Sequence, residues 1–177
     1  CTAHIFKKLI AICEEKDVHT LEQVNVMGQA STDAVAKLPS YHVILLAQNN
    51  TGRVNLYTMV SESHITYYNR RPKVPKSLLN KHREGVLVGS ACEAGELYRA
   101  LLDEKSEEDI ARIASYYDYL EIQPTGNNAF MVTSDKQRNI TSLEDIKAIN
   151  KHIVSLGEQL NKLVVATCDV HFLDPED

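Results

Sequence analysis

The sequence has few cysteines, and none of its four is spaced from another as in a C-x-x-C motif. This usage gives no sign of a disulfide framework and favours a reducing, cytoplasmic setting. Long apolar runs are missing too, since none approaches the roughly 20 residues that cross a membrane. The first residues mix charged with apolar side chains, unlike a signal peptide. We therefore expect a cytoplasmic protein with no membrane partner.

Positive charge is also in short supply, because 19 lysines and arginines face 24 acidic residues in the 177-residue chain, for a net charge of −5. Surfaces that bind nucleic acid electrostatically are basic, so we do not expect this segment itself to bind nucleic acid. The net negative charge does not exclude that this segment belongs to a larger DNA-binding chain. The composition, with 44% hydrophobic and 24% charged residues, is typical of a globular domain with a real core.

Both ends of the sequence suggest a piece of a longer protein. The chain starts without methionine, inside an amphipathic helical pattern over Thr2–Lys16 that no N-cap residue precedes, and it stops directly after a predicted strand. Thr20 and Gln23 then have the spacing of a capping box and predict a short helix over Leu21–Val24. Residues 25–40 lose this pattern and predict a linker between two structural units.

From residue 41 onward, short apolar runs alternate with helical patterns. Strands are predicted over Tyr41–Ala47, Val86–Ser90, Tyr117–Pro124 and Leu163–Thr167. Helices are predicted over Asn55–His64, Ser77–His82, Glu96–Leu102, from Ser106 onward, and over Leu143–Leu160, capped by Ser142. This order predicts an α/β fold with right-handed crossovers and a parallel sheet. Four strands do not close a barrel, so any barrel needs strands from elsewhere.

Two of these segments carry more specific expectations. Tyr41–Ala47 is almost continuously apolar, which predicts a strand covered on both faces, as in a parallel sheet. Thr125–Ile140 is polar and contains Gly126-Asn127-Asn128, which predicts a loop.

Candidate metal ligands stand at or beyond the ends of predicted elements. Asp169 and His171 follow the last strand, and in an extended chain residues two apart point to the same side. A carboxylate and an imidazole placed together suit a hard cation or zinc, although they also suit a satisfied structural pair. Cys92 follows a strand's carboxyl end, where α/β folds place their chemistry, but buried cysteines are mostly inert packing. His64 ends a predicted helix, a position that the helix dipole alone favours.

The only local cluster of positive charge is Tyr67–Lys76, which is aromatic as well as basic and contains two prolines. It could touch phosphate or a neighbouring domain. It could equally be a solvated loop punctuated by proline.

A family resemblance rests on several stretches of the sequence. They are Tyr41–Asn50 with Thr51-Gly52 and Asn55-Leu56, Gly85–Glu96, Tyr117–Pro124 and Val164–Asp177. Together they resemble the PHP (polymerase and histidinol phosphatase) domain of the bacterial DNA polymerase III α subunit. The amino-acid sequences of Gly89–Tyr98 and of Asp169–Asp177 are most similar to the PolC type.

This resemblance implies the later strands and helices of a distorted seven-stranded, TIM-like PHP α/β barrel with a parallel sheet. In the PolC type, a proofreading 3′–5′ exonuclease is inserted inside the PHP domain. Residues 1–24 would then be terminal helices of that exonuclease, residues 25–40 a linker, and residues 41–177 the C-terminal part of the PHP domain.

The resemblance also implies a set of metal ligands. The family's site binds divalent ions, zinc or manganese, and its later ligands map onto His64, Cys92, Asp169 and His171. Cys92 stands where other PHP proteins carry histidine, and a thiolate is an acceptable zinc ligand. The remaining ligands would lie before the exonuclease, so we expect this segment alone to bind metal poorly and to be inactive.

By function, the resemblance implies a fragment of a replicative DNA polymerase whose PHP domain braces the polymerase and has phosphoesterase activity in some relatives. The parent would be a nucleotidyltransferase that uses magnesium, and its partners would be the rest of the α chain, DNA and replisome subunits in the bacterial cytoplasm. One alternative is a free-standing metal-dependent phosphatase resembling histidinol phosphatase, which an H-x-H strand end directly upstream would favour. Another is a purely structural interaction module.

Overall fold

The computed structural model describes residues 2–21, 23–24, 28, 31–134 and 139–168. Its elements in chain order are α1 (Thr2–Glu15), α3 (Thr32–Lys37), β1 (Ile44–Ala47), α4 (Asn50–Ile65), α5 (Lys76–Lys81), β2 (Val86–Gly89), α6 (Glu96–Leu102), α7 (Glu107–Ser115), β3 (Tyr119–Ile122), η1 (Thr125–Thr133), α8 (Leu143–Gln159) and β4 (Leu163–Ala166). The predicted alternation of strands and helices, and with it an α/β fold, is confirmed.

Capping side chains decide where several of these helices begin. Ser106 caps α7 and Ser142 caps α8, both as predicted, because each hydroxyl accepts a hydrogen bond from a backbone N–H in the first turn. The side chain of Asn49 accepts a hydrogen bond of 2.9 Å from the Gly52 N–H. Helix α4 therefore begins before the predicted Asn55.

The strands within the described residues form one sheet in the order β1-β2-β3-β4. β3 pairs in parallel with β2 and with β4, as expected. β1 pairs antiparallel with β2, in a register that runs from Ile44 opposite Gly89 to Ala47 opposite Val86. The prediction of a wholly parallel sheet is therefore wrong for β1.

The reason for the reversal lies where β1 ends and β2 begins. The Gln48 N–H donates a hydrogen bond of 2.9 Å to the Gly85 carbonyl, so the end of β1 is tied to the start of β2. A Cβ atom on Gly52 would lie 1.7 Å from that same carbonyl oxygen, and Gly85 itself has a φ of 70°. Two glycines thus let the first turn of α4 touch the loop before β2.

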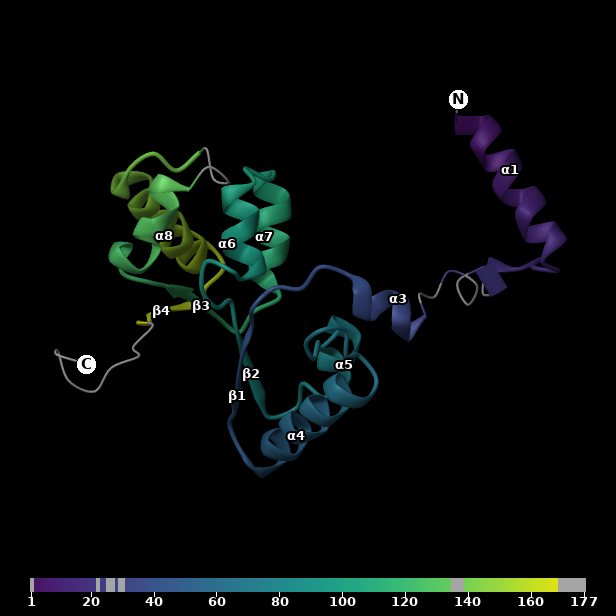
Figure 1. Cartoon of the computed structure of the whole chain (residues 1–177), viewed down its shortest axis with the longest axis horizontal. Coiled ribbons are helices and arrows are strands. Elements are labelled where there is room, and N and C mark those ends of the chain that lie inside the picture. The colour runs from purple at the N-terminus through teal and green to yellow at the C-terminus, as the bar shows by residue number, and fades with distance from the viewer. Residues whose placement is uncertain (1, 22, 25–27, 29–30, 135–138, 169–177) are drawn as a thin grey trace.

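The hydrophobic core lies around the two inner strands. Val88 on β2 and Leu120 on β3 are completely buried, together with Ile146 on α8 and Met59 on α4. Figure 1 shows α6, α7 and α8 grouped beside β3 and β4, with α4 and α5 beside β1 and β2. Burial of these apolar side chains is the main source of stability in the fold.

The outer strand β1 is much less covered than its sequence predicts. Ile44 is 38% exposed and Leu46 is 48% exposed. The expectation that Tyr41–Ala47 is covered on both faces is therefore wrong for the described residues, and the strand itself is shorter, Ile44–Ala47.

Two segments predicted to be irregular contain helices. α3 lies in the predicted linker, where Ser31 caps it, and η1 lies in the predicted loop Thr125–Ile140.

The predicted capping box is confirmed, because Gln23 N–H donates to Thr20 Oγ1 at 3.2 Å and Thr20 N–H donates to Gln23 Oε1 at 3.0 Å.

The first helix, α1, has no buried residue, and Figure 1 shows it set apart from the other elements. The side chains of its predicted inner stripe are exposed, with Ile5 at 59% and Leu9 at 53%. Among the helices described, none is both long and apolar enough to pass through a bilayer.

Candidate functional site

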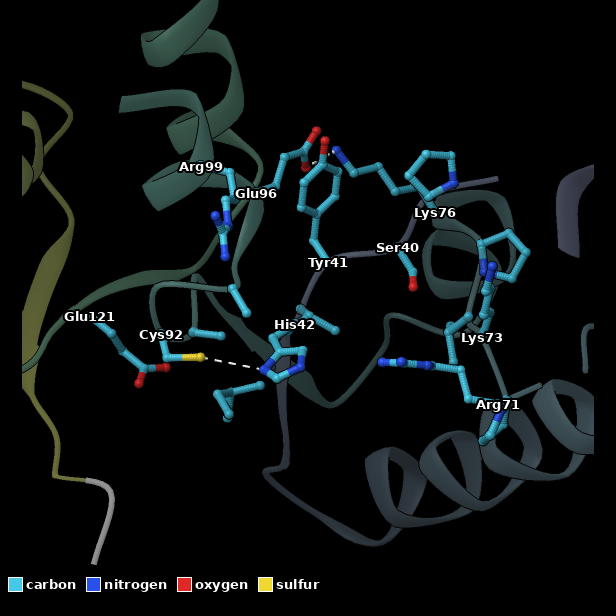
Figure 2. A pocket seen from close by; sticks show the side chains of 18 of the residues that line it. Ser40, Tyr41, His42, Arg71, Lys73, Lys76, Cys92, Glu96, Arg99 and Glu121 are labelled. Atoms are coloured by element: carbon cyan, nitrogen blue, oxygen red, sulfur yellow. Dashed lines mark hydrogen bonds and ion pairs between the residues drawn. The ribbon is translucent and has the colours of Figure 1, made fainter. Parts of the chain in front are cut away.

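One edge of the sheet gathers the chemically reactive side chains. Because β1 is antiparallel to β2, the residues before β1 lie at the same edge as the carboxyl ends of β2, β3 and β4. Cys92 follows β2 and His42 precedes β1, and their Sγ and Nδ1 atoms are 3.4 Å apart (Figure 2). A sulfur and an imidazole nitrogen in contact are a donor pair that zinc and other transition metals accept.

The backbone around Cys92 is held in an unusual conformation. Ala91 has a φ of 60°, a left-handed value that costs a residue with a Cβ atom about 1 kcal/mol or more. The Gly95 N–H donates to the Cys92 carbonyl at 2.8 Å, and a Cβ on Gly95 would lie 2.2 Å from the Ser90 carbonyl oxygen. The His42 N–H donates to the Ala94 carbonyl at 3.0 Å, so the same turn positions both side chains.

Partial burial raises the pKa of the Cys92 thiol, and the nearby Glu93 carboxylate opposes ionisation further, although a backbone hydrogen bond from Ala94 offsets part of this effect. The thiol is therefore not a ready nucleophile, because nucleophilic cysteines have a lowered pKa. A metal ion at this position would supply the positive charge that the thiolate needs.

A buried carboxylate lies at the same edge. Glu121 on β3 is 6% exposed, and its Oε2 accepts a hydrogen bond of 3.1 Å from the Thr167 hydroxyl. Its other oxygen, Oε1, is buried and has no hydrogen-bond partner among the described residues. Burial, and then the charge and hydrogen bonding of Glu121, raise the pKa of the Tyr119 hydroxyl, so this hydroxyl lies close to the carboxylate. An orphaned buried oxygen of this kind fits a site that a cation, or a ligand of one, completes.

The predicted ligands divide into three groups. Cys92 lies in this site, whereas Asp169 and His171 are outside the described residues. The described chain nevertheless leads to the site, because Thr167 and Cys168 line the same pocket. His64 is exposed at the end of α4 and does not line this pocket, and its Nδ1 is 2.8 Å from the Val60 carbonyl.

Since a carbonyl only accepts, the His64 Nδ1 carries the proton in this contact, which leaves Nε2 as the nitrogen free to bind a metal. No three histidine, cysteine, aspartate or glutamate side chains of the described residues are arranged to hold a metal ion together. The described part therefore brings together an incomplete donor set.

A large open pocket of about 1320 Å³ surrounds these groups. Its wall opposite Cys92 and His42 is basic, with Arg71, Lys73 and Lys76 from the predicted basic segment (Figure 2). Two of these cations already have partners. Lys76 pairs with Glu96 at 2.6 Å, and Lys73 donates to the Leu38 carbonyl at 2.6 Å.

Sequence reasoning missed His42 and Glu121. His42 stands at the start of an apolar strand, and in a wholly parallel sheet it would lie at the opposite edge from Cys92. Glu121 looks like a solvent-facing residue in an alternating strand. The only available signal was a polar side chain inside each predicted strand segment.

Comparison with known proteins gives consistent matches. The sequence profile of the family described as the PHP domain matches residues 7–125. The chain is 47% identical over 172 residues to the DNA polymerase III PolC-type of Clostridium perfringens, covering 97% of this chain and 11% of that protein. It is 42% identical over 177 residues to the protein of the same description from Bacillus subtilis, covering 99% of this chain and 12% of that protein. The chain thus spans about an eighth of the length of these relatives.

Proposed function

Because this chain belongs to the PHP-domain family, we propose that it is part of a replicative DNA polymerase of the PolC type and contributes to a divalent-metal site at the carboxyl edge of its sheet. The whole protein would be a nucleotidyltransferase that uses magnesium for synthesis and acts on DNA in the bacterial cytoplasm. A free-standing histidinol-phosphatase-like enzyme is not favoured, since strong matches over nearly the whole chain are to much longer polymerases.

The observation that carries the metal proposal is the contact of 3.4 Å between Cys92 Sγ and His42 Nδ1. Asp169 and His171 follow directly on a segment that lines the same pocket through Cys168. We therefore assign Cys92, His42, Asp169 and His171 as ligands of zinc or manganese. His64 stays a predicted ligand, with Nε2 as its free nitrogen.

The orphaned oxygen of Glu121 supports this donor set. A buried carboxylate oxygen without a partner costs free energy, which a positive charge or a further donor facing it would offset. Carboxylates that do not touch the metal commonly orient metal-bound histidines by accepting a hydrogen bond from their other ring N–H. Glu121 lines the same pocket as His42 and Cys92, and it would accept such a hydrogen bond from a histidine of the metal site.

When bound, divalent ions lower the pKa of a coordinated water and neutralise phosphate charge, which is the chemistry of phosphoester hydrolysis. The chain's own residues would fix the position of the site through the turn after β2 and orient the ligands. The site would thus act as a phosphoesterase, or as a metal-dependent brace that holds the sheet edge to the rest of the α chain.

The domain boundaries follow the same proposal. Residues 1–24 would close the inserted 3′–5′ exonuclease, and the exposed apolar stripe of α1 would pack against that domain. Residues 25–40, including α3, would link the two units. Residues 41–177 would supply the later strands of a seven-stranded PHP barrel, and the exposed side chains of β1 would be covered by its earlier strands. Replisome subunits would be partners of the whole protein.

Metal analysis of the natural polypeptide that contains this chain tests the proposal. Cys92→Ser, His42→Ala and Asp169→Ala should each lower zinc or manganese affinity by about tenfold or more, because each removes a ligand or its support. Cys13→Ser makes the same chemical change on α1, away from the pocket, and should leave metal content unchanged. Wild-type metal content in all three site variants would contradict the assignment.

A second measurement separates the two roles of the site. Hydrolysis of p-nitrophenyl thymidine phosphate that is lost in Asp169→Ala identifies a phosphoesterase. A metal-dependent rise in Tm without hydrolysis identifies a brace.

A further inference from the structure

The pocket has two chemically different walls, and the basic wall is not used by the metal proposal. One wall holds the sulfur, imidazole and carboxylate of Cys92, His42 and Glu121. The other presents Arg71, Lys73 and Lys76, and Arg99 reaches into the pocket from α6 on the side of Cys92 (Figure 2).

Both lysines of this wall have hydrogen-bond partners among the described residues, but the arginines do not. Lys76 is paired with Glu96, and Lys73 is held by a backbone carbonyl. Arg71 and Arg99 make no side-chain hydrogen bond or ion pair with any residue that the structure describes. Two guanidinium groups in one pocket without carboxylate partners raise the local affinity for anions.

The direction of the arginine side chains points inward. Figure 2 shows the guanidinium of Arg71 extending across the pocket toward His42, and that of Arg99 reaching down from α6 on the side of Cys92. A ligand beside the Cys92–His42 pair would therefore meet a guanidinium from each of two separate elements. The planar fork of arginine matches the oxygens of phosphate and can donate two parallel hydrogen bonds to them.

We propose that Arg71 and Arg99 form an anion subsite that binds the phosphate group of a phosphoester beside the Cys92–His42 pair. The inference rests on the proposed function for the metal, which would neutralise the opposite side of the same phosphate. The pocket, at about 1320 Å³, exceeds the range of about 300 to 1,000 Å³ of ordinary small-molecule sites, so a nucleotide unit fits. Arg71 is the principal contact because it faces His42 directly.

The subsite also gives a role to the basic segment around Arg71. Only one of its two adjacent arginines lines the pocket, since Arg70 does not. Arg70 has a φ of 62°, so the chain turns sharply between the neighbours. The segment is therefore not a uniform solvated cluster, and its two arginines can be distinguished by experiment.

Phosphate binding to the natural polypeptide tests the proposal, with inorganic phosphate and thymidine 5′-monophosphate as probes in isothermal titration calorimetry. Arg71→Gln should weaken both by about 10- to 100-fold, as expected for losing hydrogen bonds between charged groups. Arg70→Gln removes the same charge one residue away and should change neither. Arg71→Lys keeps the positive charge but loses the planar guanidinium. Its phosphate affinity should lie between those of the wild type and Arg71→Gln. Arg99→Gln should weaken binding less than Arg71→Gln.

The titrations are repeated after the metal is removed with a chelator. If Arg71→Gln has normal metal content before chelation and still weakens phosphate binding in the metal-free protein, the subsite stands whether or not the metal assignment holds. Equal binding by Arg71→Gln and Arg70→Gln, or no phosphate binding by the wild type, overturns the subsite. Loss of metal from Cys92→Ser is a separate readout and reports only on the proposed metal centre.

Discussion

The inner and outer strands of the sheet have similar sequences but different surroundings. Val88 on β2 and Leu120 on β3 are fully buried, whereas Leu46 on β1 is 48% exposed and Leu163 on β4 is 69% exposed. The inner strand β2 and the outer strands β1 and β4 are all short apolar runs, so composition alone does not separate them. The difference shows that the chain's own helices cover the centre of the sheet and leave its outer strands to be covered by something else.

The candidate site spans the inner and the outer strands, since Cys92 follows β2 and Glu121 lies on β3. His42 precedes β1, and Asp169 follows β4 by way of Thr167 and Cys168. Of the donors that we assign to the metal, Cys92 is held by a covered strand, whereas His42 is held by the poorly covered strand β1. This arrangement fits a chain whose site is completed by other parts of a longer polypeptide.

The largest effect that tests this contrast is expected from truncating leucines on the two kinds of strand. Leu120→Ala should lower the free energy of unfolding by about 3 kcal/mol, because it opens a cavity in the core. Leu46→Ala, the same change on β1, should cost less than about 1 kcal/mol in the separate 177-residue chain. Urea unfolding followed by circular dichroism measures both.

The same pair sharpens the comparison in the natural polypeptide. If other strands cover β1 there, Leu46→Ala should become much more costly, while the effect of Leu120→Ala should stay similar. Equal losses for the two variants in the separate chain would contradict the division into covered and uncovered strands.

A smaller effect is expected where β1 joins β2. Gly52→Ala places a methyl group 1.7 Å from the Gly85 carbonyl oxygen, so the first turn of α4 must move away. Overpacking of this kind costs about 2 kcal/mol. The change should also weaken the antiparallel pairing, which amide hydrogen exchange at Leu46 and Gln48, whose N–H groups face β2, would detect as loss of protection.

Gly126→Ala is the matched control for this change, because a Cβ atom there meets nothing within 4 Å. It should leave both stability and exchange in β1 nearly unchanged. Normal exchange in Gly52→Ala would show that the glycine contact does not set the direction of β1.

Much of the fold could be predicted from local signals. The caps Ser106 and Ser142 predicted the starts of α7 and α8, and the spacing of Thr20 and Gln23 predicted a capping box that the structure contains. The direction of β1 could not be predicted, because an apolar run has the same pattern in a parallel and in an antiparallel strand. The deciding contact joins Gly52 to Gly85, which lies far along the chain.

The site was predicted only in part, for the same reason. The position of Cys92 beyond a strand's carboxyl end is a local feature and was recognised. Its neighbour His42 comes from a distant segment, and the two meet only because β1 is reversed. The burial of Glu121 likewise depends on packing between strands, since a polar residue in an alternating strand usually faces solvent.

The smallest effect is expected at the start of α8, the helix that packs on the covered strand β3. Ser142 Oγ accepts a hydrogen bond from the Asp145 N–H at 3.3 Å and donates to the Asp145 carboxylate at 3.0 Å. Ser142→Ala should cost about 1 kcal/mol at neutral pH, as for other N-caps. Ser61→Ala, on the exposed surface of α4, is the control and should cost nothing.

The cost should also depend on pH. Hydrogen bonds from the Thr141 backbone N–H and hydroxyl, and then from Ser142, hold the pKa of Asp145 below its usual value. A carboxyl with a lowered pKa in the folded state stabilises the protein above its unfolded pKa of about 3.9, and this stabilisation is lost as pH falls through the folded pKa. Because protonated Asp145 no longer completes the capping box, the difference between wild type and Ser142→Ala should shrink in acid. Urea unfolding of both proteins from pH 7 down to about pH 3 measures it, and a difference that stays constant over that range would show that Asp145 and Ser142 are not coupled.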